Sequence, residues 1–535
     1  MSFTLAPELV WGLIPRFVGV VYVLAFTPLI LLHEIIPGSH RLAPIRVLRE
    51  RIRRDYPGPT AFLAQPTLLW INDSDAMQRG LAIAGCLCGG VAMYGGPLTP
   101  YALFIAWLAW LSLEPRGLMF PWDTMLLEIG FLVLFLPAPR ALPSLDASAL
   151  PLPSVAFMVR WLVLRLMLGF GKDKFLKTTK SDFLFLRGFF VWMPLPSPLG
   201  WYAHHAPAWA LKLGLLFMFL AEIVAPVLGL FAGPLRLVAF VLLVGLMAGI
   251  HATGNWGFFN VAYALFCVCL LDTQSSIFDL FKEPWASSLT SFPDVVVHAL
   301  MALLFLVSLF YLPNNSFLTR SWVNWTPEMF PVEAKDRRKA VRIHRLLTPL
   351  RLLAPFRIVN GYGVFPPHSA PPIRLLPVLE GSADGVHWKQ YGYRYMPSFA
   401  TSRPPFVAPY HPRFDQWTYY VTMGIDAGSL FGALFPMSLP YHVSARASVL
   451  DLLMQRVLAG DEKMTRILGH NPFPEAPPKW MRVGMLAMTP TLPSELRATG
   501  HWWHIRRVGT LYPARGLESW PDRLVIPEPE VFHPD

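Results

Sequence analysis

The segment VWGLIPRFVGVVYVLAFTPLILL, residues 10–32, decides the class of this protein. Arg16 is its single charged residue. An apolar run of about 20 residues is long enough to cross the hydrocarbon core of a bilayer as an α-helix. A second run of this kind, LRLVAFVLLVGLMAGIH, occupies residues 235–251. Because lipid offers no partners to backbone N–H and C=O groups, both runs predict transmembrane helices.

The composition of the whole chain supports this interpretation. Hydrophobic residues make up 54% of the 535 residues and charged residues only 15%, whereas a typical soluble domain carries about 25% charge. These figures exclude a disordered chain, a collagen-like repeat and a disulfide-stapled secreted module. The net charge of +11 is explained by basic loops that face anionic lipid head groups. The bilayer is therefore an expected partner, and nucleic acid is not.

Nine apolar segments predict a polytopic α-helical membrane bundle of about eight or nine helices. Several segments are shorter than about 20 residues, which leaves re-entrant or interfacial helices open. Segment 152–170 carries Arg160 and Arg165, so we expect it to lie on the surface or its arginines to snorkel toward water. The nine segments are 10–32, 79–96, 98–113, 124–137, 152–170, 207–232, 235–251, 256–271 and 294–313.

The composition changes near residue 330. Residues 331–535 contain 24 Lys and Arg and 16 Asp and Glu, against 21 and 18 in the first 330 residues. This charge density indicates that the tail is a water-facing domain. We predict a multi-pass transmembrane domain over 1–330, a basic amphipathic linker helix over 331–355 and a β-rich soluble C-terminal domain over 356–535.

Alternation of apolar and polar residues in the tail predicts strands. LLPVLE, residues 375–380, is expected to pair with WKQYGYRY, residues 388–395, across the turn GSADG. Residues 445–469 have a helical pattern, which the proline-rich NPFPEAPP ends. Together these elements predict a small β-sandwich with one helical insertion. Further strands are expected at 356–365, 483–488 and 501–512.

Two loops, 40–54 and 172–187, are the most basic of the chain. With nine spans, both lie on the same side of the membrane as the C-terminal domain, and the positive-inside rule makes that side cytoplasmic. One span more or fewer between residues 187 and 330 places the domain opposite the second loop. The residues alone therefore leave the orientation of the domain open.

Ionisable and amide side chains in or beside the apolar runs are the candidates for a membrane cavity. Such groups are costly in lipid, so they either serve a function or pair with one another inside the bundle. Asp123 and Glu128 are equally well explained as buried acids that arginines and backbone N–H groups satisfy. Asn255 lies in HATGNWGFFN, residues 251–260, which predicts either a cavity lining or a plain helix break. The seven candidates are Asp123, Glu128, His204, His205, Glu222, His251 and Asn255.

Metal and cofactor chemistry find little support in the sequence. His204 and His205 are adjacent and point in different directions on a helix, which disfavours a shared metal ion. The four cysteines form two C-x-C pairs within apolar segments, where thiols usually act as small hydrophobic groups. The sequence contains no P-loop, nucleophile elbow, Rossmann fingerprint or zinc-protease helix. We therefore expect no metal and no cofactor, and the catalytic residues, if any, stay unknown.

A series of conspicuous strings runs through both halves of the chain. They are QPTLLWINDSD (65–75), WDTMLLEIGFL (122–132), PLPSPLGWYAHHAP (194–207), TGNWGFFN (253–260), FRIVNGYGVF (356–365), EGSADGVHWKQYGYRY (380–395), RPPFVAPYHPRFD (403–415), VLAGDEKMTRILGHNPFPEAPP (457–478) and GHWWHIRRVGTLYP (500–513). In this order, and over roughly residues 10–515, they resemble the lipase maturation factor family. Two stretches, 33–56 and 186–193, depart from the family pattern, so a client other than a lipase stays open.

The resemblance implies a multi-pass membrane protein that helps secreted lipases reach their active, assembled form, with no established catalytic step. It implies an endoplasmic reticulum membrane with a luminal C-terminal domain, or, in a bacterium, the inner membrane with a periplasmic domain. We follow this orientation rather than the basic loops, because long domains translocate largely regardless of charge. The membrane half is also similar, at the level of the fold, to vitamin K-dependent carboxylase and its horizontally transferred transmembrane relatives.

Two hypotheses follow for the function. In the first, the protein is a chaperone-like assembly factor whose tail binds a secreted lipase or another client protein. In the second, it is a membrane enzyme or transporter that acts on a small or lipid substrate between the helices. Polar and aromatic positions of the tail are candidates for client contact, although burial within the β-rich domain explains them equally well. They are Arg357, Asn360, Glu380, Trp388, Arg413 and Asp415.

Overall fold

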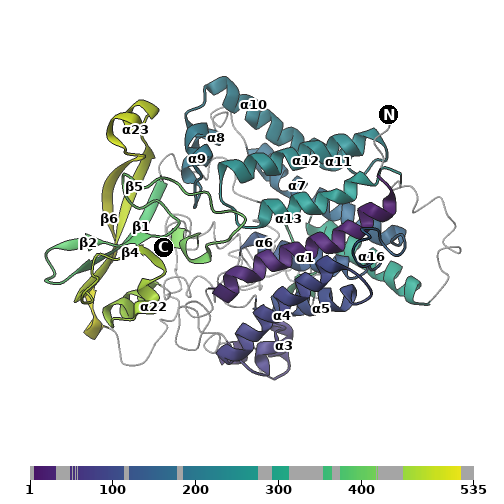
Figure 1. Ribbon diagram of the computed structural model, residues 1–535, viewed down its shortest axis with the longest axis horizontal. Helices are drawn as coiled ribbons and strands as arrows, with labels where there is room; N and C mark the ends of the chain where they lie inside the picture. Colours follow the sequence, from purple (N-terminus) through teal and green to yellow (C-terminus); the bar gives the residue numbers. More distant parts are fainter. Residues whose placement is uncertain are drawn as a thin grey trace, which may run out of the picture.

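The chain forms a bundle of helices with an antiparallel sheet at one end (Figure 1). This architecture comes from a computed structural model, which describes the following residues: 5–31, 49–50, 52–54, 56, 58–113, 120–177, 185–274, 292–311, 353–363, 374–416, 418–419 and 450–519. Most of the predicted linker helix 331–355 lies outside the described residues.

Each of the nine apolar segments contains helix. The corresponding helices are α1 (Pro7–Leu31), α4 (Asp75–Tyr94), α5 (Thr99–Leu113), α6 (Pro121–Val133), α7 (Pro153–Lys177), α10 (Ala208–Phe219), α12 (Pro234–Thr253), α13 (Phe259–Phe266) and α16 (Phe292–Tyr311). Short elements connect or extend them: α3 (Thr60–Ala64), η1 (Leu68–Trp70), α8 (Phe185–Trp192), α9 (Pro198–His204), the π-helical η4 (Leu220–Val224), α11 (Ala225–Leu228) and η5 (Cys267–Leu271).

Five helices among the described residues are long and apolar enough to cross a membrane. They are Pro7–Leu31, Asp75–Tyr94, Pro153–Lys172, Ala208–Leu228 and Pro234–Thr253. Three further apolar helices, Thr99–Leu113, Phe259–Leu271 and Pro293–Leu309, are shorter than a full span. The N-terminal part is thus helical with about five candidate spans, and the predicted count of eight or nine is not confirmed.

Helix α7 is the most buried of the candidate spans. Arg160 donates to Asp272 at 2.6 Å, and Arg165 pairs with Glu128 of α6. The prediction that this segment lies on the surface or snorkels is wrong. Both arginines are buried because each finds an acidic partner on another part of the bundle.

Glycines bring α1 and α4 into close contact. A Cβ atom on Gly19 would lie 2.6 Å from the carbonyl oxygen of Gly89, and a Cβ on Gly89 would lie 2.8 Å from that of Gly19. One turn away, the ring of Phe26 occupies the space beside Gly85. Small residues four apart on a helix allow such backbone contact, which stabilises helix pairs in lipid through dispersion.

The C-terminal region contains a four-stranded antiparallel sheet of order β2-β1-β5-β6. Glu380 of β1 is paired with Gln390 on one side and Arg482 on the other. The hairpin predicted at 375–380/388–395 is shorter than expected: residues 380–382 pair with 388–390, whereas Gly392 and Tyr393 pair with residues 468–470. The strands predicted at 483–488 and 501–512 are present. The strands are β1 (Arg374–Ser382), β2 (Trp388–Gln390), β5 (Trp480–Pro490) and β6 (Trp503–Gly516), and a separate two-stranded ladder joins β3 (Gly392–Tyr393) to β4 (Leu468–His470).

Other expectations for the tail differ from the structure. The described residues show one sheet and one short ladder, so a β-sandwich is not confirmed. The strand predicted at 356–365 is wrong over its described part, where η7 (Ala354–Phe356) leads into irregular backbone. The helix predicted at 445–469 is shorter: residues 450–458 and α22 (Glu462–Thr465) are helical, and β4 follows.

The α1–α4 contact generates a prediction. Gly89→Leu forces the two backbones apart, and overpacking of this kind costs about 1–3 kcal/mol. We expect a lower melting temperature for the detergent-solubilised protein, followed by tryptophan fluorescence. Gly90→Leu is the matched control, because no atom lies within 4 Å of a Cβ placed there. Equal melting temperatures for the two variants would contradict the close contact.

Candidate functional site

The polar candidates of the membrane half and those of the tail contact one another. Three of the former, Asp123, Glu128 and Asn255, bind residues between 360 and 413 of the tail. We call this set of buried contacts the joint. It holds the tail against the end of the helical bundle where α6 begins.

The first contact of the joint is an ion pair. The two terminal guanidinium nitrogens of Arg413, Nη1 and Nη2, donate to the carboxylate of Asp123, each at 2.9 Å. The same carboxylate accepts the backbone N–H of Phe120 at 2.9 Å, which caps the first turn of α6. Both charged side chains are buried, so each depends on the other for the charge that water would otherwise stabilise.

The second contact centres on Glu128, one and a half turns further along α6. Its carboxylate pairs with Arg165 of α7 and accepts the backbone N–H of Asn360 at 2.8 Å. The Tyr362 hydroxyl donates to it at 2.7 Å, and the Asn360 amide at 3.0 Å. Arg165 in turn donates to the Asn360 carbonyl at 3.1 Å. One buried acid therefore joins two helices and a loop of the tail.

The third contact is the side-chain amide of Asn255, which forms hydrogen bonds with backbone groups of both the membrane half and the tail. The Asn255 side-chain oxygen accepts the N–H groups of Val407 and Ala408 at 2.7 and 2.9 Å. Its amide nitrogen donates to the carbonyls of Leu195 and Pro405 at 3.2 and 2.9 Å. Asn255 therefore binds the RPPFVAP segment, residues 403–409, to the connection that precedes α9.

Two further contacts tie the tail to the connection around α8 and α9. Arg374, the first residue of β1, donates to the carbonyls of Met193 and Pro194, the latter at 2.6 Å. Its guanidinium lies 4.5 Å from the ring centre of Tyr419. Burial lowers the pKa of Arg374 to about 10, which leaves it charged at neutral pH. Trp201 of α9 donates its indole N–H to the Trp502 carbonyl at 2.9 Å.

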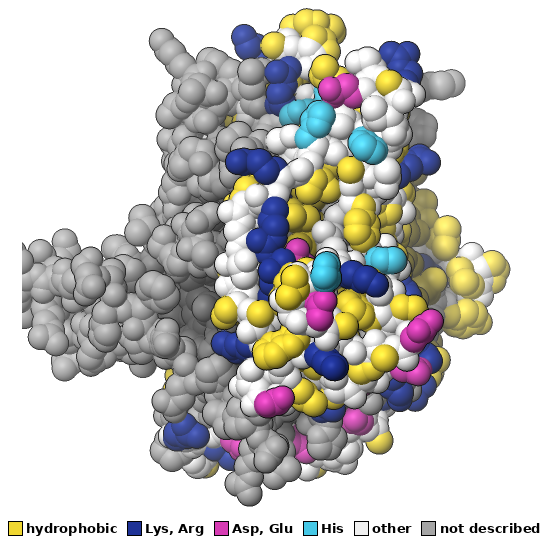
Figure 2. Space-filling view, turned by 90° about the vertical axis from the view of Figure 1, so that its left-hand side faces the viewer, with side chains coloured by type: hydrophobic (Ala, Val, Ile, Leu, Met, Phe, Trp, Pro, Cys, Tyr) yellow, Lys and Arg dark blue, Asp and Glu magenta, His cyan; other side chains and the backbone are white. Residues whose placement is uncertain are grey.

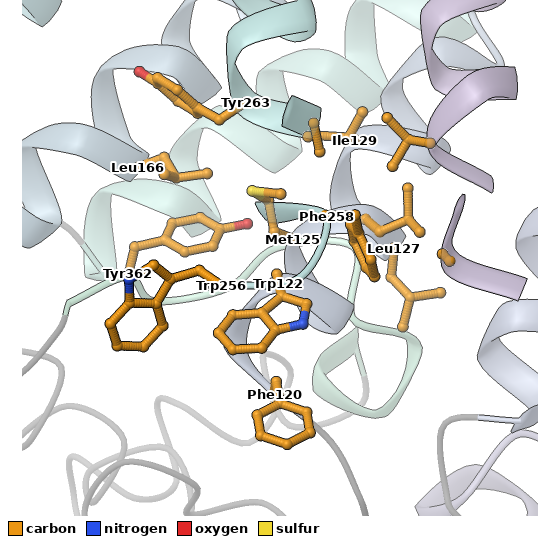
Figure 3. Close-up of a cluster of buried hydrophobic side chains, with 14 of the residues drawn as sticks. Phe120, Trp122, Met125, Leu127, Ile129, Leu166, Trp256, Phe258, Tyr263 and Tyr362 are labelled. Atoms are coloured by element: carbon orange, nitrogen blue, oxygen red, sulfur yellow. The ribbon is translucent and has the colours of Figure 1, made fainter. Parts of the chain in front are cut away.

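Aromatic rings surround these polar contacts. Figure 3 shows Trp122 and Trp256 beside Tyr362 of the tail, and the two indole rings are 6.3 Å apart in an edge-to-face arrangement. His411 packs its ring 4.5 Å from that of Phe120 and accepts the Trp122 indole N–H at 3.4 Å. Burial holds the pKa of His411 well below its usual value, so it is neutral at physiological pH.

The other cavity candidates lie outside the joint. Glu222, in the π turn η4, pairs with Lys174 of α7 at 2.5 Å. His204 shares a hydrogen bond of 2.8 Å with the Arg187 carbonyl, and His205 packs against the Trp201 ring. His251 lies near the end of α12. The structure therefore does not gather the seven candidates into one site.

The candidate client residues of the tail are mostly buried. Arg357, Glu380, Arg413 and Asp415 are all nearly inaccessible to solvent. Glu380 accepts from Arg482 at 2.5 Å and Arg507 at 3.0 Å within the sheet. The ring of Trp388 is covered by the guanidinium of Arg482 at 4.0 Å.

Sequence reasoning missed several partners in the joint. The position of Arg165 within an apolar segment indicates that it needs an acidic partner. The sequence around Arg374 and Tyr419 has no feature that predicts a contact with the membrane half. Among the described residues, no group of three His, Cys, Asp or Glu is placed to hold a metal ion. The carboxylates of the joint are engaged with arginine and backbone donors, so the arrangement can position the tail.

The Asp123–Arg413 pair generates a prediction. Arg413→Met leaves a buried carboxylate without its partner, which typically costs about 3–5 kcal/mol. The double variant Asp123→Asn with Arg413→Met removes both charges, and we expect it to regain much of the lost stability in thermal unfolding. Arg482→Met is the control, because Glu380 keeps Arg507. Additive losses in the double variant would contradict the coupling.

The buried carboxyl of Asp415 generates a second prediction. It accepts the Tyr395 N–H at 2.9 Å, and burial raises its pKa to about 7. The unfolded chain releases this proton near pH 4, so the free energy of unfolding falls as pH rises from about 4 to about 7. Relative to Asp415→Asn, the native protein should gain up to about 1.4 kcal/mol per pH unit on acidification through this window. Parallel stability curves for the two proteins would contradict it.

Comparison with known proteins covers both halves of this architecture. Residues 10–278 match the lipase maturation factor transmembrane domain, and residues 358–513 match the lipase maturation factor C-terminal domain. Lipase maturation factor 2 of Mus musculus is 27% identical over 605 aligned positions, which cover 94% of this chain and 82% of the relative. Lipase maturation factor 1 of Mus musculus is 24% identical over 561 positions, with 97% and 90% covered.

Lipase maturation factor 2 of Homo sapiens is 27% identical over 610 positions, covering 94% of this chain and 82% of that protein. No solved structure matches the chain. The region that matches the transmembrane domain contains α6, with Asp123 and Glu128, and α7, with Arg165. The region that matches the C-terminal domain contains the tail residues that bind the two acids. By both of its matched domains, the chain belongs to the lipase maturation factor family.

Proposed function

We propose that this protein is a membrane-bound factor that helps a secreted lipase reach its active form by binding it, in the manner of a chaperone. The names of its relatives support a role in lipase maturation. The observation that carries the mechanism is the joint, in which Asp123, Glu128 and Asn255 are engaged in holding the tail. Because these groups are used to hold the tail in place, the structure favours a protein that binds a client over one that catalyses a reaction between the helices.

The contact surface in this proposal is the edge strand β6. It is the last strand of the four-stranded sheet, and within the described residues no strand pairs with its outer edge. Exposed residues occur on both of its faces, among them Arg506, Arg507 and Val508. An open edge offers backbone N–H and C=O groups to an extended segment of another chain.

The charge of this surface suggests the kind of segment that binds. On the outer face of the C-terminal domain, basic side chains gather in a band, with histidines nearby (Figure 2). Arg506 and His504 are exposed on β6. We propose that β6 binds an extended, acidic segment of an incompletely folded lipase, since opposite charges favour the encounter and fix its register.

The proposed location follows the family. In a eukaryotic cell the protein would lie in the endoplasmic reticulum membrane with a luminal C-terminal domain, and in a bacterium in the inner membrane with a periplasmic domain. A secreted client folds on that side of the membrane. Long domains translocate largely regardless of the charge of neighbouring loops, so the basic segments near α3 and α8 do not oppose this orientation.

The test measures secreted lipase activity per milligram of lipase antigen, with the gene present, deleted and restored. Deletion should lower this specific activity without lowering the antigen. The gene carrying Val508→Glu should restore it only weakly, because each 1.4 kcal/mol lost in binding is about a tenfold loss of affinity. Val386→Glu is the matched control: Val386 is 73% exposed and Val508 43%, and Val386 lies in the turn at the opposite edge of the sheet.

Three results separate the parts of this proposal. Unchanged specific activity after deletion would contradict the maturation role. Full activity of Val508→Glu, with deletion harmful, would contradict only the β6 contact. Equal damage from Val508→Glu and Val386→Glu, at normal protein level, would also contradict a contact specific to β6.

A further inference from the structure

Exposed apolar side chains gather where the C-terminal region meets the ends of α10 and α12. Trp209 is 67% exposed, Leu492 56% and Phe406 54%, which is unusual for side chains of this size. They come from both halves of the molecule. We call this set the apolar rim, and its members are Leu199, Tyr202, Trp209, Phe406 and Leu492.

Helix α9 fixes the rim to the last turn of α12. The hydroxyl of Ser197 donates to the Ala252 carbonyl at 2.7 Å, and a Cβ on Gly200 would lie 2.2 Å from the Thr253 carbonyl oxygen. Leu199 and Tyr202 are three residues apart on this short helix and therefore share a face. Both stand at the end of a candidate membrane span.

The tail brings its own members to the same place. The ring of Phe406 lies 5.5 Å from that of His251, which is in the last turn of α12. The Trp502 ring lies 6.2 Å from that of Tyr202. Thr491 donates its backbone N–H to the Trp502 carbonyl at 3.1 Å, so Leu492 follows directly after a residue held at α9.

The rim continues the lipid-facing side of the spans. Trp209, Leu213 and Leu216 are all exposed on α10 and recur at helical spacing, so they form one apolar stripe. The spans Ala208–Leu228 and Pro234–Thr253 have most of their residues outside the protein core, as expected for helices that face lipid. The stripe reaches the rim at Trp209, and the exposed Lys212 lies on the same side of α10, beside Trp209.

The composition of the rim also matches a membrane boundary. Tryptophan and tyrosine are enriched where hydrocarbon meets head groups, because their rings are apolar with one polar atom. Arginine and lysine are common there too, and Arg403 lies 5.9 Å above the Trp502 ring. A basic group beside exposed aromatics suits the phosphates of a lipid leaflet.

We propose that the apolar rim lies in the boundary between head groups and acyl chains of one leaflet, so that the C-terminal domain touches the bilayer through Phe406 and Leu492. The occupant of this surface is lipid, because the rim is continuous with the lipid-facing stripe of α10. The contact adds a second attachment of the sheet to the membrane and sets the height of β6 above it. This inference stands on the membrane spans and does not require the proposed client.

The test places a nitroxide spin label on the full-length protein in nanodiscs of phosphatidylcholine and phosphatidylglycerol. Leu492→Cys and Phe406→Cys are labelled separately, in a variant whose four cysteines are replaced by alanine. Collision rates with oxygen, which prefers lipid, and with a nickel chelate, which prefers water, report the depth of each label. Leu216→Cys is the reference within lipid, and Val386→Cys is the reference in water.

We expect nickel accessibility at both rim positions to fall to about a third or less of that at Val386→Cys, as for groups buried 5–10 Å into an interface. Water-like accessibility at both positions would overturn the proposal. Accessibility that is water-like in discs holding one protein and falls only after lipase is added would also overturn it, since a client would then be the occupant. Nickel accessibility that is low only in discs with two copies of the protein would also overturn the proposal, since the second copy would then cover the rim. Either labelled position alone suffices if the other variant does not fold.

Discussion

The pairing of Glu128 with Arg165 is the constraint on which the architecture depends. An unpaired carboxylate or guanidinium inside a helical membrane bundle is costly, so α6 and α7 must be adjacent and in register. The carboxylate still has lone pairs after this ion pair, and Asn360 and Tyr362 of the tail supply donors to them. The position of the tail thus follows from the remaining hydrogen-bond acceptors of the Glu128 carboxylate on α6. The Asp123–Arg413 pair repeats the same logic at the beginning of α6.

The joint changes how substitutions at its residues should be interpreted. Asp123 and Arg413 represent two competing hypotheses, a membrane cavity and a client surface, and they are partners of one another. Loss of function after replacing either residue would reflect a displaced tail. Exposed residues such as Val508 and Leu492 are better probes, because their replacement leaves the joint intact. The useful distinction in this fold is between buried and exposed positions.

The helices were predictable because each depends on a long apolar run, a local property of the sequence. The hairpin β1–β2 was predictable for the same reason, from alternation around a short turn. The fate of Arg160 and Arg165 was not, because their acidic partners lie 112 and 37 residues away. Residues around Asn360 alternate like a strand and yet form an irregular loop, because their polar groups bind Glu128 rather than a neighbouring strand. The joint is a tertiary feature, and Arg374 shows that its members can lack any local signal.

The long separation within the joint bears on how the protein is made. Glu128 precedes its hydroxyl donor Tyr362 by 234 residues, and Asp123 precedes Arg413 by 290. A chain that emerges from the ribosome must hold these acids in the helical bundle before their partners in the tail exist. Synthesis of the bundle therefore ends in a provisional state, with Asp123 lacking its arginine, and only the arrival of the tail completes it. A chain that stops after the helices would keep the Glu128–Arg165 pair and the Asp123 cap of α6, but it would bury the Asp123 carboxylate without Arg413.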